Sequence, residues 1–136
     1  WWFFETGGAV AAFRPTTGGP GAWLDGLRAR ARLPAVARDL ALTAAAERQA
    51  EAVCSGARAT HARGAETPGD RARAEGFVRP VAENVAVAGS AARAFENLLW
   101  SPSHRRTMLD PAARQVGIAL ERAGDSICLV QLFGYE

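Results

Sequence analysis

The chain of 136 residues lacks several features that would point directly to a function. It contains no lysine, so its 16 basic residues are all arginine, and against 14 acids they leave a formal net charge of only +2. The arginines are scattered and form no basic stripe with interleaved aromatics, so the sequence does not predict nucleic-acid binding. No apolar run approaches the ~20 residues needed to span a bilayer. A secretory leader is not visible, and this has no bearing on export.

Cysteine is scarce as well. Cys54 and Cys128 are the only two, and they are too far apart for a Cys-x-x-Cys metal or redox motif. One interpretation is a single disulfide between a helix and a late strand, which would stabilise the fold by ~4 kcal/mol and imply an oxidising compartment. The other is a pair of separate buried thiols that pack as small apolar side chains. We favour the disulfide.

Two hydrolase signatures are missing, namely His-Glu-x-x-His and the Gly-x-Ser-x-Gly nucleophile elbow. The chain has only two histidines, His61 and His104, and Glu83 stands roughly midway between them. Imidazole is the side chain most used for metal binding and proton transfer near neutral pH, so these three residues are candidates for one cleft. Together with a water they could hold zinc in a catalytic arrangement. Nothing marks a separate general base, so we expect a binding protein rather than an enzyme.

The composition is that of one folded domain. Apolar residues make up 49% of the chain and charged residues 22%, which is enough for a core and an ordinary surface. Residues 1–21 are expected to form an aromatic arm and a Gly/Pro/Thr linker, and residues 22–136 the domain. Four consecutive aromatics, Trp1 to Phe4, are costly in water. The arm should therefore cover the core, or else contact a partner, a membrane or a second copy of the chain.

Periodicity and capping residues predict the helices. One helix should run from Gly21 to just before Leu33. Further helices should follow the N-caps Asp39, Thr67 and Ser90, the first ending near Cys54, the second at Glu75 and the third at Trp100. A short helical turn should begin at Ser101-Pro102 and place His104 in its first turn.

Alternating apolar residues predict strands over 81–87, 115–121 and 126–133, the last two joined by a turn at Gly124-Asp125. In the first strand Glu83 shares a face with Val81, Val85 and Val87. A carboxylate on an apolar face is costly unless it is paired or protonated, so something should satisfy it, and a histidine or a metal would do so. The order of elements indicates an α+β fold with an antiparallel sheet covered by helices.

Several short motifs occur in an order typical of one protein family. Residues 83–86 read Glu-Asn-Val-Ala, residues 100–109 contain Ser-Pro-Ser-His-Arg after a tryptophan, and residues 116–118 read Val-Gly-Ile. Residues 30–40 resemble the pattern Arg-x-x-x-Gly-Leu-Pro-Pro-Leu-x-x-Asp-x-x-Leu. Together they resemble the bacterial branch of the CAP superfamily (cysteine-rich secretory proteins, antigen 5 and pathogenesis-related 1), whose module is also called the SCP domain. The resemblance covers roughly residues 22–134. The chain departs from the family pattern in two places. Two residues are missing between Trp100 and the Ser-Pro pair, and Ser103 stands where the family usually has glycine.

The resemblance implies a three-layer αβα sandwich in a secreted, periplasmic or envelope-associated bacterial protein. It implies that His61, Glu83 and His104 line a central cleft, with Glu96 as a candidate fourth residue, and that His61 and His104 could hold Zn²⁺ or another divalent cation weakly. The expected partner is a small molecule, a lipid or a peptide. A metal-dependent hydrolase using the same cleft, with Glu83, His104 and His61 as candidate catalytic residues, is the first alternative. An interaction module that self-associates through the aromatic arm is the second.

Overall fold

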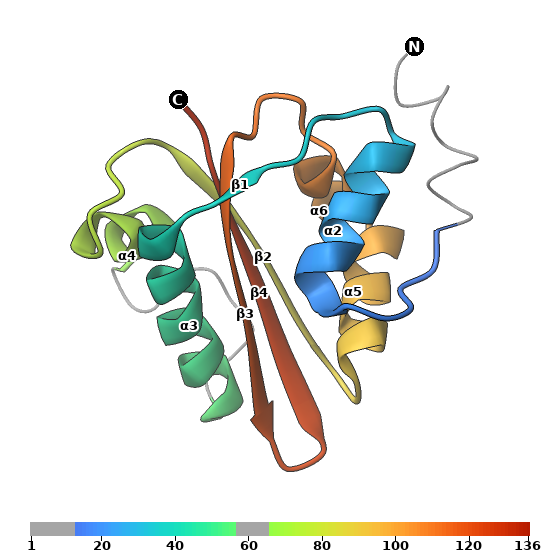
Figure 1. Ribbon diagram of the computed structural model, residues 1–136. Coiled ribbons are helices and arrows are strands. Elements are labelled where there is room, and N and C mark those ends of the chain that lie inside the picture. Colours follow the sequence, from blue (N-terminus) through green and yellow to red (C-terminus); the bar gives the residue numbers. More distant parts are fainter. Residues whose placement is uncertain (1–12, 57–65) are drawn as a thin grey trace.

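The computed structural model describes residues 13–56 and 66–136 as a mixed α+β domain (Figure 1). The elements along the chain are α2 (Gly19–Arg30), β1 (Ala37–Arg38), α3 (Leu40–Cys54), α4 (Pro68–Ala74), β2 (Val81–Ala88), α5 (Ala91–Trp100), α6 (Pro102–Met108), β3 (Gln115–Ala123) and β4 (Ser126–Gly134). None of the helices within these ranges is long and apolar enough to cross a membrane.

The sheet lies between two layers of helices. Its strand order is β1-β3-β4-β2, with β3 and β4 as a hairpin, β2 antiparallel to β4 and the short β1 parallel to β3. Helices α3 and α4 pack on one face, while α5 and α6 pack on the other and α2 packs on α5 (Figure 1). The predicted αβα sandwich with a mainly antiparallel sheet is confirmed.

The predicted caps determine where three helices begin. The Asp39 side chain accepts a hydrogen bond from the Leu42 main-chain N–H, and the Ser90 hydroxyl accepts one from Arg93. Thr67 opens α4 through a capping box. Helix α2 instead begins at Gly19, before the predicted Gly21, because Pro20 occupies its first turn and Gly18 adopts a left-handed conformation with φ of 97°.

Each face of the sheet carries its own apolar core. Phe95 on α5, Phe133 on β4 and Leu27 on α2 belong to one cluster, and Leu42 on α3 with Val130 on β4 belong to the other.

Phe13, from the segment predicted as an arm and linker, is buried in the first cluster. Its ring centroid lies 5.9 Å from that of Phe95. The described end of that segment is therefore part of the core. The terminal aromatics Trp1 to Phe4 lie outside the described residues.

Strand β3 departs from its predicted pattern at one residue. Val116 is fully buried as expected, but Leu120, predicted to share its buried face, is 46% exposed. Leu120 lies near the hairpin end of β3, toward the Gly124 turn, where the helix layer of that face leaves the strand partly open. Apolar alternation gave the correct face of the sheet and could not show where the covering helices end.

The two cysteines form the predicted disulfide, Cys54–Cys128. It joins the last residue of α3 to β4 and closes a loop of 74 residues in sequence separation. By the loop-closure relation such a crosslink stabilises the fold by about 4 kcal/mol. It also fixes the helix end immediately before the segment that leads to His61.

Candidate functional site

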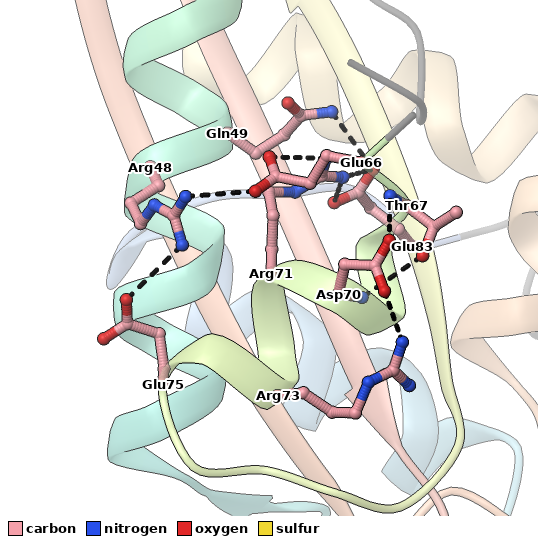
Figure 2. A network of polar contacts seen from close by, with 9 residues as sticks. All are labelled: Arg48, Gln49, Glu66, Thr67, Asp70, Arg71, Arg73, Glu75 and Glu83. Atoms are coloured by element: carbon pink, nitrogen blue, oxygen red, sulfur yellow. Dashed lines mark hydrogen bonds and ion pairs between the residues drawn. The ribbon is translucent and has the colours of Figure 1, made fainter. Parts of the chain in front are cut away.

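Glu83 is the centre of a buried ionic network between β2 and two helices. Its side chain is 1% exposed, and Arg71 on α4 donates from Nη2 to both carboxylate oxygens, at 3.2 Å to Oε1 and 3.0 Å to Oε2. Gln49 on α3 donates from Nε2 to Oε1 at 3.2 Å. Figure 2 shows the three side chains pointing toward one another. The Glu83 carboxylate, which needs partners on the apolar face of β2, is therefore paired with an arginine and an amide.

The position of Arg71 follows from the first turn of α4. Thr67 accepts a hydrogen bond from the Asp70 N–H, and Asp70 accepts one from the Thr67 N–H, with Pro68 between them. The Thr67 main chain and then the guanidinium of Arg73 lower the pKa of Asp70 below its ordinary value. With its start fixed, the helix places Arg71 on the side facing the sheet, where the side chain is 2% exposed.

The network continues outward to the surface. Arg71 Nη1 lies 3.8 Å from Glu66 Oε1, and Glu66 Oε2 lies 3.2 Å from Arg48 Nη2 on α3. Arg48 Nη1 lies 3.5 Å from Glu75 Oε2, just after α4 (Figure 2). A continuous chain of charges therefore connects a buried carboxylate to partly exposed groups on α3 and at the two ends of α4.

His104 lies on the opposite face of the sheet, in the first turn of α6. Its Nδ1 is 2.9 Å from the hydroxyl oxygen of Ser101, the residue that precedes the helix. Its main-chain carbonyl accepts a hydrogen bond of 3.0 Å from Asn84 Nδ2. The residue is half-buried. The Ser101 contact orients the ring and engages Nδ1.

Asn84 connects α6 to the middle of the sheet. Besides the carbonyl of His104, its amide donates to Gln131 Oε1 on β4 at 3.1 Å, and both side chains are buried. Because successive residues of a strand face opposite sides, Glu83 and Asn84 bind different helix layers. The Glu-Asn pair of the sequence motif therefore holds α4 from one face and α6 from the other.

The structure settles only part of the predicted site. Asn84 connects the two residues: the Glu83 side chain binds Arg71 on one face of β2, and the main-chain carbonyl of His104 accepts from the Asn84 side chain on the other face. His61 lies outside the described residues. Glu96 is on α5 and half-exposed. The grouping of these four residues in one cleft therefore remains a prediction.

The donors of the described segments do not by themselves fit a zinc site. Within residues 13–56 and 66–136 there is no group of three or more His, Cys, Asp or Glu side chains placed to hold a metal. Both oxygens of Glu83 are engaged by Arg71, and a structural or catalytic zinc needs at least three protein ligands. A zinc site at His61 and His104 remains a prediction, and no chemistry is derived through it.

Sequence reasoning missed the residues that satisfy Glu83. Arg71 carried a usable signal, because it follows the Thr67 cap at the spacing that turns a side chain inward, and a buried carboxylate requires a cationic partner. Gln49 carried a weaker one, since it lies between exposed Glu47 and Glu51 and yet faces the sheet. Asn84 was within the recognised motif but had no assigned role.

The fold, the Glu-Asn pair and the His104 turn define a module of known type. The model of the cysteine-rich secretory protein family, CAP, matches residues 22–133. The chain belongs to this family. No curated protein matches the sequence significantly.

Solved bacterial structures share the fold at low sequence identity. An outer surface protein of Borrelia burgdorferi superposes with a TM-score of 0.78 at 21% identity, over 85% of this chain and 88% of its own. An extracellular protein of Bacillus anthracis containing an SCP domain gives 0.75 at 22% identity, over 85% of this chain. A cysteine-rich secretory protein of Staphylococcus aureus gives 0.61 at 18% identity, over 87% of this chain. The chain spans only 39% of the Bacillus protein and 40% of the Staphylococcus protein.

Proposed function

We propose that this CAP domain works outside the cytoplasm as a ligand-binding module. The disulfide Cys54–Cys128 supports this location, because such bonds persist in oxidising compartments. The structural relatives are described as extracellular, outer surface and secretory proteins, which agrees with it. A protein secreted, periplasmic or held at the cell envelope fits these observations.

The observation that carries the binding proposal is the pair of polar clusters that flank β2. A buried ion pair is expensive to assemble and gives little stability over apolar packing, so its presence on one face of β2, with the half-buried His104 on the helix that covers the other face, favours a functional role. We place the ligand at the end of β2 where α4 and α6 approach it, with His104 as the contact residue on one side. Glu83 acts as a positioning residue that holds α4.

The ligand classes that fit are a lipid, a small molecule or a peptide, with a divalent cation as a further candidate if His61 joins His104. We prefer binding to hydrolysis because Glu83, the candidate general base, is already held through both oxygens by Arg71. A general base needs a lone pair directed at a substrate proton or a water.

The test uses two probes, Zn²⁺ followed by calorimetry and the fluorescent fatty acid cis-parinaric acid followed by emission. We expect at least one probe to bind the wild type and to bind His104→Ala at least tenfold more weakly. His61→Ala should reproduce the loss for zinc only if both imidazoles hold the ion. The matched control is Arg106→Ala, an exposed residue of the same helix, which should bind as the wild type does.

The proposal fails if neither probe binds, or if the wild type and His104→Ala bind both probes equally. A chelator-sensitive turnover of peptide or ester substrates that Glu83→Gln abolishes would instead support the hydrolase.

A further inference from the structure

Strand β2 forms one edge of the sheet, and its main chain has a defined direction there. Tyr135 donates from its main-chain N–H to the Pro80 carbonyl at 3.0 Å, in line with the register that pairs Val81 with Gly134. In an antiparallel ladder, hydrogen-bonded and non-hydrogen-bonded pairs alternate. The even-numbered residues from Ala82 to Ala88 therefore bond β4. The odd-numbered ones turn their N–H and C=O groups outward, away from β4.

The second half of this edge has none of the usual protection against pairing. Among the strands of the described ranges, β2 pairs with β4 alone, and no hydrogen bond joins the main chain of Val85 or Val87 to another described segment. Natural edge strands are protected by lysine, proline, bulges or charged side chains. Residues 85–88 read Val-Ala-Val-Ala, and their register with β4 is continuous. The one charge of β2, Glu83, is neutralised beneath α4.

The surroundings of the edge restrict what can occupy it. Helix α4 packs on one face of β2, and α5 and α6 pack on the other. The edge of a second folded copy would bring its own two helix layers against these helices. A single extended chain adds only one strand, roughly 5 Å wide, and its main chain supplies the donors and acceptors that the outward groups require.

We propose that residues Val85–Ala88 bind an extended peptide as an added strand of the sheet. This site does not depend on the ligand proposed for His104. Side chains of the peptide would lie beside Val85 and Val87 on one face and beside Ala86 and Ala88 on the other. Val87 is 42% exposed, so an apolar residue next to it buries surface that now contacts water. Ala88 is small and partly exposed, so a larger side chain fits beside it, and the uncharged edge selects an uncharged segment.

The probe is an acetylated and amidated heptapeptide that alternates threonine and valine, added to ¹⁵N-labelled full chain and followed by NMR. The amide signals of Val85 and Val87 should shift, and these N–H groups should exchange more slowly with solvent. The N–H groups of Ala86 and Ala88 are the internal reference, because they already bond β4. The same peptide N-methylated at alternate residues should not bind, because it lacks the main-chain donors.

Two variants of one residue separate main-chain pairing from side-chain contact. Val87→Pro removes an outward N–H without removing a bond to β4, so the domain should fold and bind the peptide at least about fivefold more weakly, the value of one main-chain hydrogen bond. Val87→Ala keeps the N–H and should bind within about twofold of the wild type. His104→Ala should bind like the wild type.

The proposal is overturned if the signals of Val85 and Val87 do not move at millimolar peptide. It is also overturned if Val87→Pro or the N-methylated peptide binds as well as its reference, or if His104→Ala abolishes binding and so places the peptide at α6.

Discussion

Glu83 and Asn84 are neighbours in β2, yet they bind helices on opposite faces of the sheet. Glu83 Oε2 lies 3.0 Å from Arg71 Nη2 on α4, and Asn84 Nδ2 lies 3.0 Å from the carbonyl oxygen of His104 on α6. A slip of β2 by one residue would exchange the two faces and place the carboxylate against α6. The two adjacent polar residues thus fix the register of β2 together with the positions of both helices.

Removing Arg71 should be strongly destabilising, because Glu83 would keep its buried charge without its main counter-ion. We expect Arg71→Met to lower the free energy of unfolding by about 3–5 kcal/mol. In the double variant Arg71→Met with Glu83→Met the buried charge is gone as well, so its loss should be much smaller than the sum of the single losses. Urea unfolding of the wild type, the two single variants and the double variant gives the coupling energy between Arg71 and Glu83.

Arg73 is the matched control for this cycle. It lies on the same helix, its side chain is 54% exposed, and it pairs with Asp70 at the surface. Such pairs contribute about 0–1 kcal/mol, so Arg73→Met should have a small effect. Additive losses at Arg71 and Glu83, or a loss at Arg73 equal to that at Arg71, would contradict the importance of the buried pair.

Gly117 allows α3 to approach β3 closely. A Cβ atom at this position would lie 2.1 Å from the main-chain carbon of Leu42 and 2.2 Å from the nitrogen of Thr43. Because the obstacle is helix backbone, it cannot rotate away, and we expect Gly117→Ala to lose at least the ~1–3 kcal/mol typical of overpacking. Gly89→Ala has nothing within 4 Å of the added carbon and should leave the thermal midpoint nearly unchanged. Equal midpoints for both variants would refute the close approach.

The sequence was most informative where the signal is local. Asp39 and Thr67 each begin a helix because their side chains accept hydrogen bonds from N–H groups a few residues later, and this needs no knowledge of the rest of the fold. The need for a partner at Glu83 was also readable, from alternation in β2. The identity of the partner was not, because 16 arginines are available and only the packing of α4 brings Arg71 to the sheet.

Tyr135 allows a direct optical test, since it is the only tyrosine of the chain. Burial, and then the neighbouring Asp110, raise its pKa to about 12. The phenolate absorbance should therefore appear with a midpoint near 12, whereas an unfolded control in guanidinium should titrate near the ordinary value of about 10.

The same shift determines how stability depends on alkaline pH. The folded state holds the phenol proton more tightly than the unfolded state. The contribution of this proton to the free energy of unfolding is therefore fully present below pH ~10 and is lost as the pH rises toward about 12. Asp110→Asn should move the optical midpoint down toward 10, while Asp125→Asn, in the exposed turn between β3 and β4, should not. A wild-type midpoint near 10 would show that partial burial and Asp110 do not raise the pKa of Tyr135.

Arg32 adopts a conformation that glycine would adopt more easily. It follows α2 with φ of 60°, the only positive φ of a non-glycine residue in the described ranges, and it is exposed. The left-handed region costs an L-residue roughly 1–2 kcal/mol, which a glycine at this position would recover. Part of this gain is offset because glycine is more flexible in the unfolded chain. We expect Arg32→Gly to stabilise the domain by about 0.5–1 kcal/mol, measured as a rise in the midpoint of urea unfolding. Glycine is also the residue that the family pattern places before Leu-Pro. The control is Ala29→Gly, an exposed position inside α2, which should destabilise by about 1 kcal/mol. If both substitutions destabilise equally, Arg32 carries no backbone strain, and arginine is more stable at this turn than the glycine of the family pattern.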